Sequence, residues 1–171
     1  MVENNINNEG PRADIRVRIA TVEDSDTLVD FACKLAFDTE NKTLDRAIVK
    51  RATETCIKNP ALGCYFLAWD ENDADKKSVG TTMLTYEMSA SVGGMIHMIQ
   101  SVYVNADARR KGIFRALYSG VVEKAKQDPL VKCVRLYVEL ENFTAQAVYE
   151  KLGMTKMDSH NFYEIDTVFS H

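Results

Sequence analysis

The chain has 171 residues, of which 46% are hydrophobic and 27% charged, and this fits one globular domain. Its net charge of −4 provides no basic field for nucleic acid. No apolar run is long enough for a membrane span or a signal peptide, so we expect a cytoplasmic protein, with the nucleus also open. The four cysteines and three histidines are scattered, so we expect free thiols and no metal site.

The first half of the chain predicts a strand, two helices and the start of a hairpin. Residues 1–14 are polar and predict a disordered tail. Residues 15–20 alternate as a half-buried strand does, and Thr21 with Asp24 has the spacing of a capping box that opens a helix. A second helix is expected over 44–58. The expected core positions are Leu28, Phe31, Ala32 and Leu35 in the first helix and Leu44, Ala47, Ile48 and Cys56 in the second.

The second half predicts strands joined first by hairpins and then by helices. Strands are expected over 63–69, 79–86, 96–104, 131–140 and 162–169. One helix follows Gly112, with Phe114, Leu117, Val121 and Ala125 as its apolar stripe. Another runs from Asn142 to Gly153, with Ala145, Val148, Tyr149 and Leu152 as its buried stripe. This order predicts an α/β (α+β) fold, a single domain over 15–171 with a mixed sheet and helices on both faces.

The stretch 96–122 has the pattern of an anion site. An apolar strand leads through a loop with Arg109, Arg110, Lys111 and Gly112 into a helix. The first N–H groups of a helix have no partner within the helix and lie at the positive end of its dipole. A solvated basic loop that only precedes a helix is the plainer alternative.

Two motifs in the chain resemble those of the GNAT superfamily of acetyl-CoA-dependent N-acetyltransferases. The first is Val102-Tyr-Val104 followed by Arg109-Arg-Lys-Gly112-Ile-Phe114, and the second is Asn142-x-x-Ala-x-x-x-Tyr149-x-x-x-Gly153. Phe114 and Met154 depart from the family pattern, which has a small residue and a Phe there. The resemblance covers 15 to about 166 and implies a mostly antiparallel sheet that splays between its central strands.

The resemblance also implies the cofactor and the residues that hold it. Backbone groups of Val102 and Val104 would bind the pantetheine arm of acetyl-CoA as an added strand does. The N–H groups from Arg109 to Phe114, Ile113 included, would hold the pyrophosphate. Asn142 would either contact the pantetheine or cap its own helix, and these two roles compete.

Tyr149 is the candidate general acid. Attack of an amine on a thioester expels a thiolate, and a phenol with a pKa near ~10 is protonated at neutral pH and can donate to the sulfur. The alternative is that Tyr149 only fills the core.

The base is left open by the sequence. Several small-amine members of the family carry a Glu at the position of Gln100. The amide side chain of Gln100 cannot accept a proton in its place. Glu87, Glu40, His97 and Glu139 are candidates in its place, each more often structural than catalytic, and a chain of waters ending in bulk solvent is equally compatible.

The acceptor is expected to be a small primary amine or polyamine, because Glu40 and Glu87 are expected near the acceptor mouth. One alternative is a protein lysine or N-terminal acetyltransferase, and another is a non-catalytic acyl-CoA sensor or interaction module. No nucleic acid or membrane partner is expected. A homodimer through the last strand is left open.

Overall fold

The computed structural model describes residues 14–158. These residues fall into two compact units, 14–137 and 138–158. No helix among them is long and apolar enough to cross a membrane. The tail before Asp14 and the strand expected at 162–169 lie outside the described residues. The single domain expected over 15–171 therefore stays a prediction.

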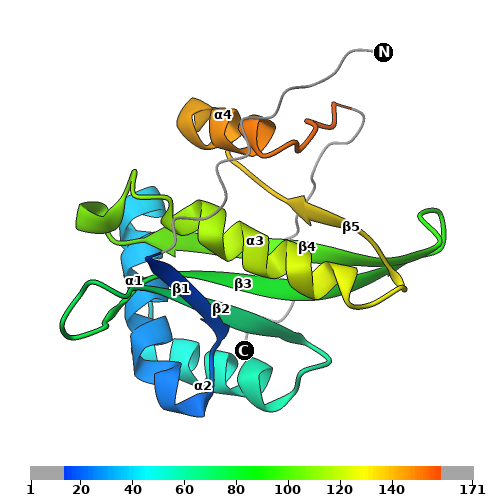
Figure 1. Cartoon of the computed structure of the whole chain (residues 1–171). Helices are drawn as coiled ribbons and strands as arrows, with labels where there is room; N and C mark the ends of the chain where they lie inside the picture. The colour runs from blue at the N-terminus through cyan, green and yellow to red at the C-terminus, as the bar shows by residue number, and fades with distance from the viewer. Residues whose placement is uncertain (1–13, 159–171) are drawn as a thin grey trace. The chain divides into compact units, whose positions relative to one another are not determined.

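The unit 14–137 is built on a five-stranded sheet whose strands lie side by side in chain order (Figure 1). The first four strands pair antiparallel with their neighbours, and the fifth pairs parallel to the fourth after a helical crossover. This confirms the mixed, mostly antiparallel sheet. The strands are β1 (Ile15–Ile19), β2 (Gly63–Asp70), β3 (Ser78–Ser89), β4 (Gly94–Val104) and β5 (Val131–Leu136).

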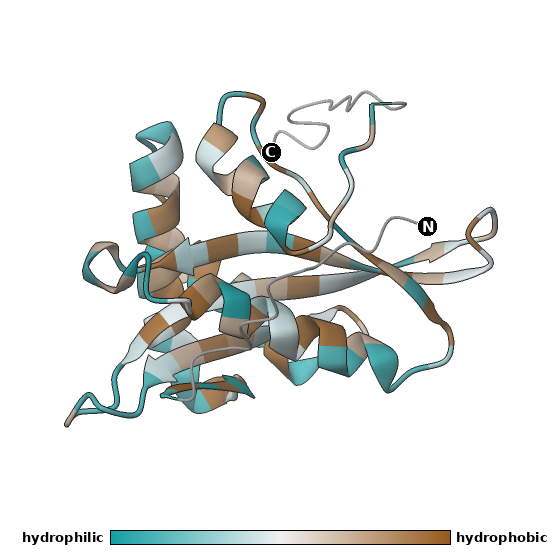
Figure 2. Ribbon diagram, turned by 45° about the horizontal axis from the view of Figure 1, so that its top comes forward, coloured by the Kyte–Doolittle hydropathy of each residue, from teal (hydrophilic) through white to brown (hydrophobic). Residues whose placement is uncertain are grey.

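Helices cover both faces of this sheet, as expected. α3 (Ile113–Lys126) lies on one face, and α1 (Ser25–Glu40) and α2 (Arg46–Lys58) lie on the other. Neighbouring residues of β2 point to opposite faces of the sheet. Phe66 packs in the hydrophobic cluster under α3, and Leu67 packs in the hydrophobic cluster under α1. Figure 2 shows the corresponding brown bands along the central strands.

The helices lie where the sequence predicts them, but some of the residues that they bury differ from those expected. α2 begins after Asp45, whose side chain accepts from the N–H groups of Ala47 and Ile48. The helix therefore buries Thr53 and Cys56, while Ala47 is exposed and Ile48 is 57% exposed. The expected core positions Ala47 and Ile48 are wrong because docking on α1 and β2, and not the number of apolar residues, sets which side of α2 faces inward. In α3, the buried residues are Ile113, Ala116, Leu117 and Val121, with Phe114 and Ala125 half-buried.

The unit 138–158 contains α4 (Phe143–Lys151). Asn142 caps it, because its side-chain oxygen accepts from the N–H of Ala145 at 3.1 Å. Gly153 follows the helix with a φ of 85°, which glycine adopts without strain. No residue of α4 is fully buried, so the expected buried stripe is corrected: Val148 is 39% exposed, and the rest of the stripe is half-buried.

Candidate active site

The site begins where β4 and β5 part. The last pair between these two strands is Ile99 with Leu136, and the strand β5 ends there rather than at Leu140 as expected. On this side of β4, the residues from Gln100 to Val104 have no strand partner among the described residues. The splay that the family resemblance implies is therefore present, and it leaves an edge that can take up an added strand.

A bulge in β4 decides which backbone groups point into this opening. Met83 pairs with Ser101 and Leu84 with Ile99, so Gln100 is an extra residue. Before the bulge, Met95 donates its N–H toward the β5 side, to Leu130. After the bulge, the alternation of backbone N–H and C=O groups between the two sides of β4 is shifted by one residue.

Val102 and Val104 present their backbone groups to the opening as a result. The N–H of Asn105 donates to Val79 on β3 at 2.9 Å, so its even-numbered neighbour Val104 faces the other way. Val102 shares that orientation, two residues earlier. Both residues therefore have the backbone orientation that an added pantetheine strand needs.

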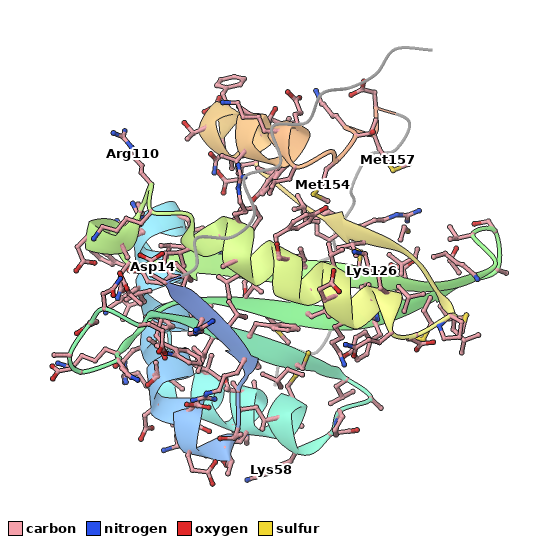
Figure 3. All side chains as sticks on the ribbon, in the orientation of Figure 1. Asp14, Lys58, Arg110, Lys126, Met154 and Met157 are labelled. Carbon is pink, nitrogen blue, oxygen red and sulfur yellow. The ribbon has the colours of Figure 1, made fainter. Side chains whose placement is uncertain are left out.

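The loop after β4 leads into an uncapped helix N-terminus. Gly112 precedes α3 with a φ of 84°, and Arg110 also has a positive φ of 64°. The first hydrogen bond of the helix ladder runs from the N–H of Ala116 to Gly112, and no side chain of the N-cap residue is available to close the end. The side chain of Arg110 extends from this loop in Figure 3. The arrangement suits an anion such as a pyrophosphate.

Arg109 is tied into the protein. Its Nε donates to the carbonyl of Val104 at 3.1 Å, and its guanidinium lies 3.3 Å from the carboxylate of Asp38 in the last turns of α1. Arg109 thus holds the loop against α1, and Arg110 and Lys111 are left exposed beside it. The Asp38 contact was missed in the sequence, because nothing in the local pattern pairs residues 71 positions apart.

The two expected acceptor carboxylates are not brought together. Glu87 is exposed and pairs with Ile96 near the start of β4. Glu40 is the last residue of α1, and it pairs with Lys42. The last turns of α1 contact Arg109, beyond the end of β4, so the two carboxylates are separated by roughly 25 Å of strand.

Of the other candidate bases, His97 lies on the face of the sheet opposite to the side chain of Gln100. Gln100 donates to the hydroxyl of Thr85 at 3.1 Å, on the face that carries α1 and α2. His97 is buried on the α3 face, with its ring 4.9 Å from that of Tyr86. Burial, and after it the charge of Lys124, lowers the pKa of His97. Glu139 is exposed and lies in the unit 138–158.

Asn142 and Tyr149 belong to the unit 138–158 together. Asn142 acts as the N-cap, so a contact with pantetheine stays a prediction. Tyr149 is half-buried on α4, and its burial raises the pKa of the phenol above its ordinary value. A phenol in this state keeps its proton over the whole neutral range, as a general acid requires.

Comparison with known proteins agrees with this arrangement. The model of the acetyltransferase (GNAT) family matches residues 26–154. No match is found among curated protein sequences. A possible acetyltransferase from Clostridium difficile 630 is 36% identical, with a TM-score of 0.78, over 89% of this chain and 97% of that one.

More distant structures share the fold. An aminoglycoside N-acetyltransferase in complex with CoA is 14% identical, with a TM-score of 0.73, over 89% of this chain and 95% of that one. A ribosomal-protein-alanine N-acetyltransferase from Brucella melitensis biovar Abortus 2308 is 16% identical, with a TM-score of 0.65, over 88% of this chain and 98% of that one.

Proposed function

Because this chain belongs to the GNAT family of acetyltransferases, and is thus an acyltransferase that uses acetyl-CoA, we propose that it acetylates a small primary amine by direct attack in a ternary complex. The observation that carries the proposal is the open edge of β4 beside the uncapped N-terminus of α3. The described residues fit the cofactor: Val102 and Val104 would hold the pantetheine arm, and the N–H groups from Arg109 to Phe114 would hold the pyrophosphate.

Acetyl-CoA, when bound, supplies an acetyl group that is activated as a thioester. The acceptor nitrogen would form its bond to the acetyl carbon, and the carbon–sulfur bond would then break. Tyr149 would donate its proton to the departing sulfur and recover one from the acceptor side through solvent. Overall, an ammonium ion and a thioester give an amide, a thiol and one proton. Gln100 cannot take up the ammonium proton, so we assign this step to water rather than to a side chain at that position.

Two measurements on the full-length protein test the proposal. Calorimetry should show acetyl-CoA binding, and thiol release should follow the addition of small primary amines. Binding without turnover on any amine or peptide would identify a sensor. Turnover on peptides alone would identify a protein acetyltransferase, and no binding would overturn cofactor use by this chain.

A further inference from the structure

A groove of about 480 Å³ lies between α2 and β3, on the face of the sheet that carries α1 and α2. Its walls are mostly apolar, with Ile48, Leu62 and Met83 among them, and Ile48 and Leu62 are about half exposed. None of the residues within 14–158 that line it carries a carboxylate. A groove of this size is in the range that takes a small molecule with an apolar body.

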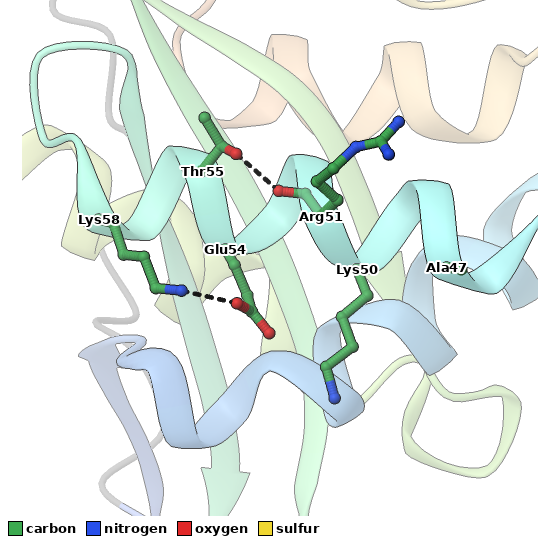
Figure 4. Close-up of a pocket in the computed structure, with 6 residues that line it drawn as sticks. All are labelled: Ala47, Lys50, Arg51, Glu54, Thr55 and Lys58. Carbon is green, nitrogen blue, oxygen red and sulfur yellow. Dashed lines mark hydrogen bonds and ion pairs between the residues drawn. The ribbon is translucent and has the colours of Figure 1, made fainter.

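One cation that lines the groove, Arg51, has no carboxylate partner in the part of the chain that the structure describes. α2 carries four basic side chains, and three of them pair with carboxylates, Lys50 with Asp26 and Lys58 with Glu54 at 2.7 Å each and Arg46 with Asp30. Arg51 has no carboxylate partner among residues 14–158, and it lines the groove. In Figure 4 the side chain of Arg51 points away from Lys50, Glu54 and Lys58, which lie along the other side of the helix.

The groove is connected to the expected site of acetyl transfer by one hydrogen bond. Thr85 lines the groove, and its hydroxyl accepts from the side chain of Gln100 at 3.1 Å. Gln100 is the bulge residue and directly follows Ile99, where β4 and β5 part. The Thr85 end of the groove therefore lies beside the residue at which the sheet opens.

We infer that the acceptor is a small amine that carries an apolar body and a free carboxylate, as an apolar amino acid does, and that Arg51 binds the carboxylate. The inference rests on the proposed function and names its substrate class. A planar guanidinium binds a carboxylate through two parallel hydrogen bonds, and this gives orientation as well as affinity. A polyamine would meet the positive charge of Arg51 and no carboxylate among the described residues that line the groove, so charge disfavours it.

The test compares three acceptors and two variants of neighbouring residues in the full-length enzyme. The acceptors are apolar amino acids, their carboxamides, which lack the carboxylate, and spermidine. The variants are Arg51→Gln and the matched control Lys50→Gln, whose side chain lies on the other side of α2. We expect amino acids to be used in preference to their amides. Arg51→Gln should raise the KM for the amino acid at least tenfold with little change in kcat, and Lys50→Gln should leave both constants unchanged.

Ile48→Asp is a second probe, because Ile48 is exposed and its replacement does not threaten the core. A carboxylate there should compete for Arg51 and raise the same KM. Preference for spermidine, or equal use of amino acids and amides, would overturn the inference while the proposed function stands. An unchanged KM in Arg51→Gln would also overturn it. Failure to bind acetyl-CoA, measured separately, would instead defeat the proposed function and the inference with it.

Discussion

At the scale of single residues, the proton of Tyr149 gives the most specific test of the proposed function. Tyr149→Phe should lower kcat about a hundredfold while acetyl-CoA affinity stays nearly unchanged, because one general acid contributes at least that factor. Burial raises the pKa of the phenol, so the fall in wild-type kcat that loss of this proton causes should lie above the ordinary tyrosine range near pH ~10. The kcat–pH profile of the variant should lack this fall. Unchanged turnover would leave Tyr149 a packing residue.

His97 gives a prediction for stability and pH. Its Nδ1 is buried without a hydrogen-bond partner among the described residues, and Tyr86, Lys124 and Asp128 are the polar and charged groups that face it. Burial and Lys124 lower its pKa in the fold, whereas the unfolded chain takes up the proton below about pH 6.5. The contribution to the free energy of unfolding is therefore complete above that pH and is lost as pH falls below it.

Urea unfolding of the wild type and His97→Leu between pH 5 and 8 measures this contribution. The slope of stability against pH should be smaller in His97→Leu, because the carboxylates that remain are the same in both proteins. Lys124→Gln removes one of the two causes and should give an intermediate slope. Equal slopes in all three would show that His97 does not resist protonation in the fold.

At the scale of elements, Gly80 allows the first residue of α3 to pack closely against the sheet. A Cβ at this position would lie 2.9 Å from a side-chain carbon of Ile113, the first residue of α3, and 2.9 Å from the carbonyl of Tyr103. Gly80→Ala should therefore destabilise the protein by about 1–3 kcal/mol and weaken acetyl-CoA binding, since it displaces the helix N-terminus. Gly93→Ala is the control, because its positive φ costs stability at a turn away from this helix. Equal acetyl-CoA affinity in both variants would contradict the seating role.

Substitutions at Asn142 can distinguish its role as a helix cap from a contact with the cofactor. Asn142→Ala should cost about 1 kcal/mol through the lost cap on α4, and Asn142→Ser should restore most of this, because a serine hydroxyl also accepts from the first-turn N–H groups. Denaturation measures stability, and calorimetry measures acetyl-CoA affinity in the same variants. If Asn142 contacts pantetheine through its amide, serine should rescue stability without rescuing affinity. Rescue of both would assign Asn142 to the cap alone.

The elements themselves were largely predictable from the sequence, and the details of the site were not. The strands and α3 follow from strong local periodicity, and the loop at Gly112 follows from a motif. The bulge at Gln100 arises from pairing between strands, so a polar residue in an apolar run was its only local sign. The groove brings together Arg51 and Thr85, which belong to different elements. The side of α2 that stays exposed depends on how the helix docks on its neighbours. The sequence pattern of a single segment contains neither kind of information.

At the scale of the whole molecule, the expectation of one domain over 15–171 can be tested by its cooperativity. Trp69, the single tryptophan, lies in β2, with its indole N–H donating to Glu71 at 2.8 Å, so its fluorescence follows only the unit 14–137. Far-ultraviolet circular dichroism follows α4 as well. If both units fold as one domain, the two thermal transitions should coincide.

Acetyl-CoA extends this test, because the proposed function gives roles to Val102, Val104 and the loop, which belong to one unit, and to Tyr149, which belongs to the other. A ligand at a hundred times its Kd stabilises the native state by about 2.7 kcal/mol, which corresponds to roughly 5–10 °C in Tm for a chain of this length. Both signals should move together by that amount if the cofactor engages both units. A shift in fluorescence alone would show that α4 unfolds independently of the bound cofactor, and Tyr149 would then lose its role as general acid.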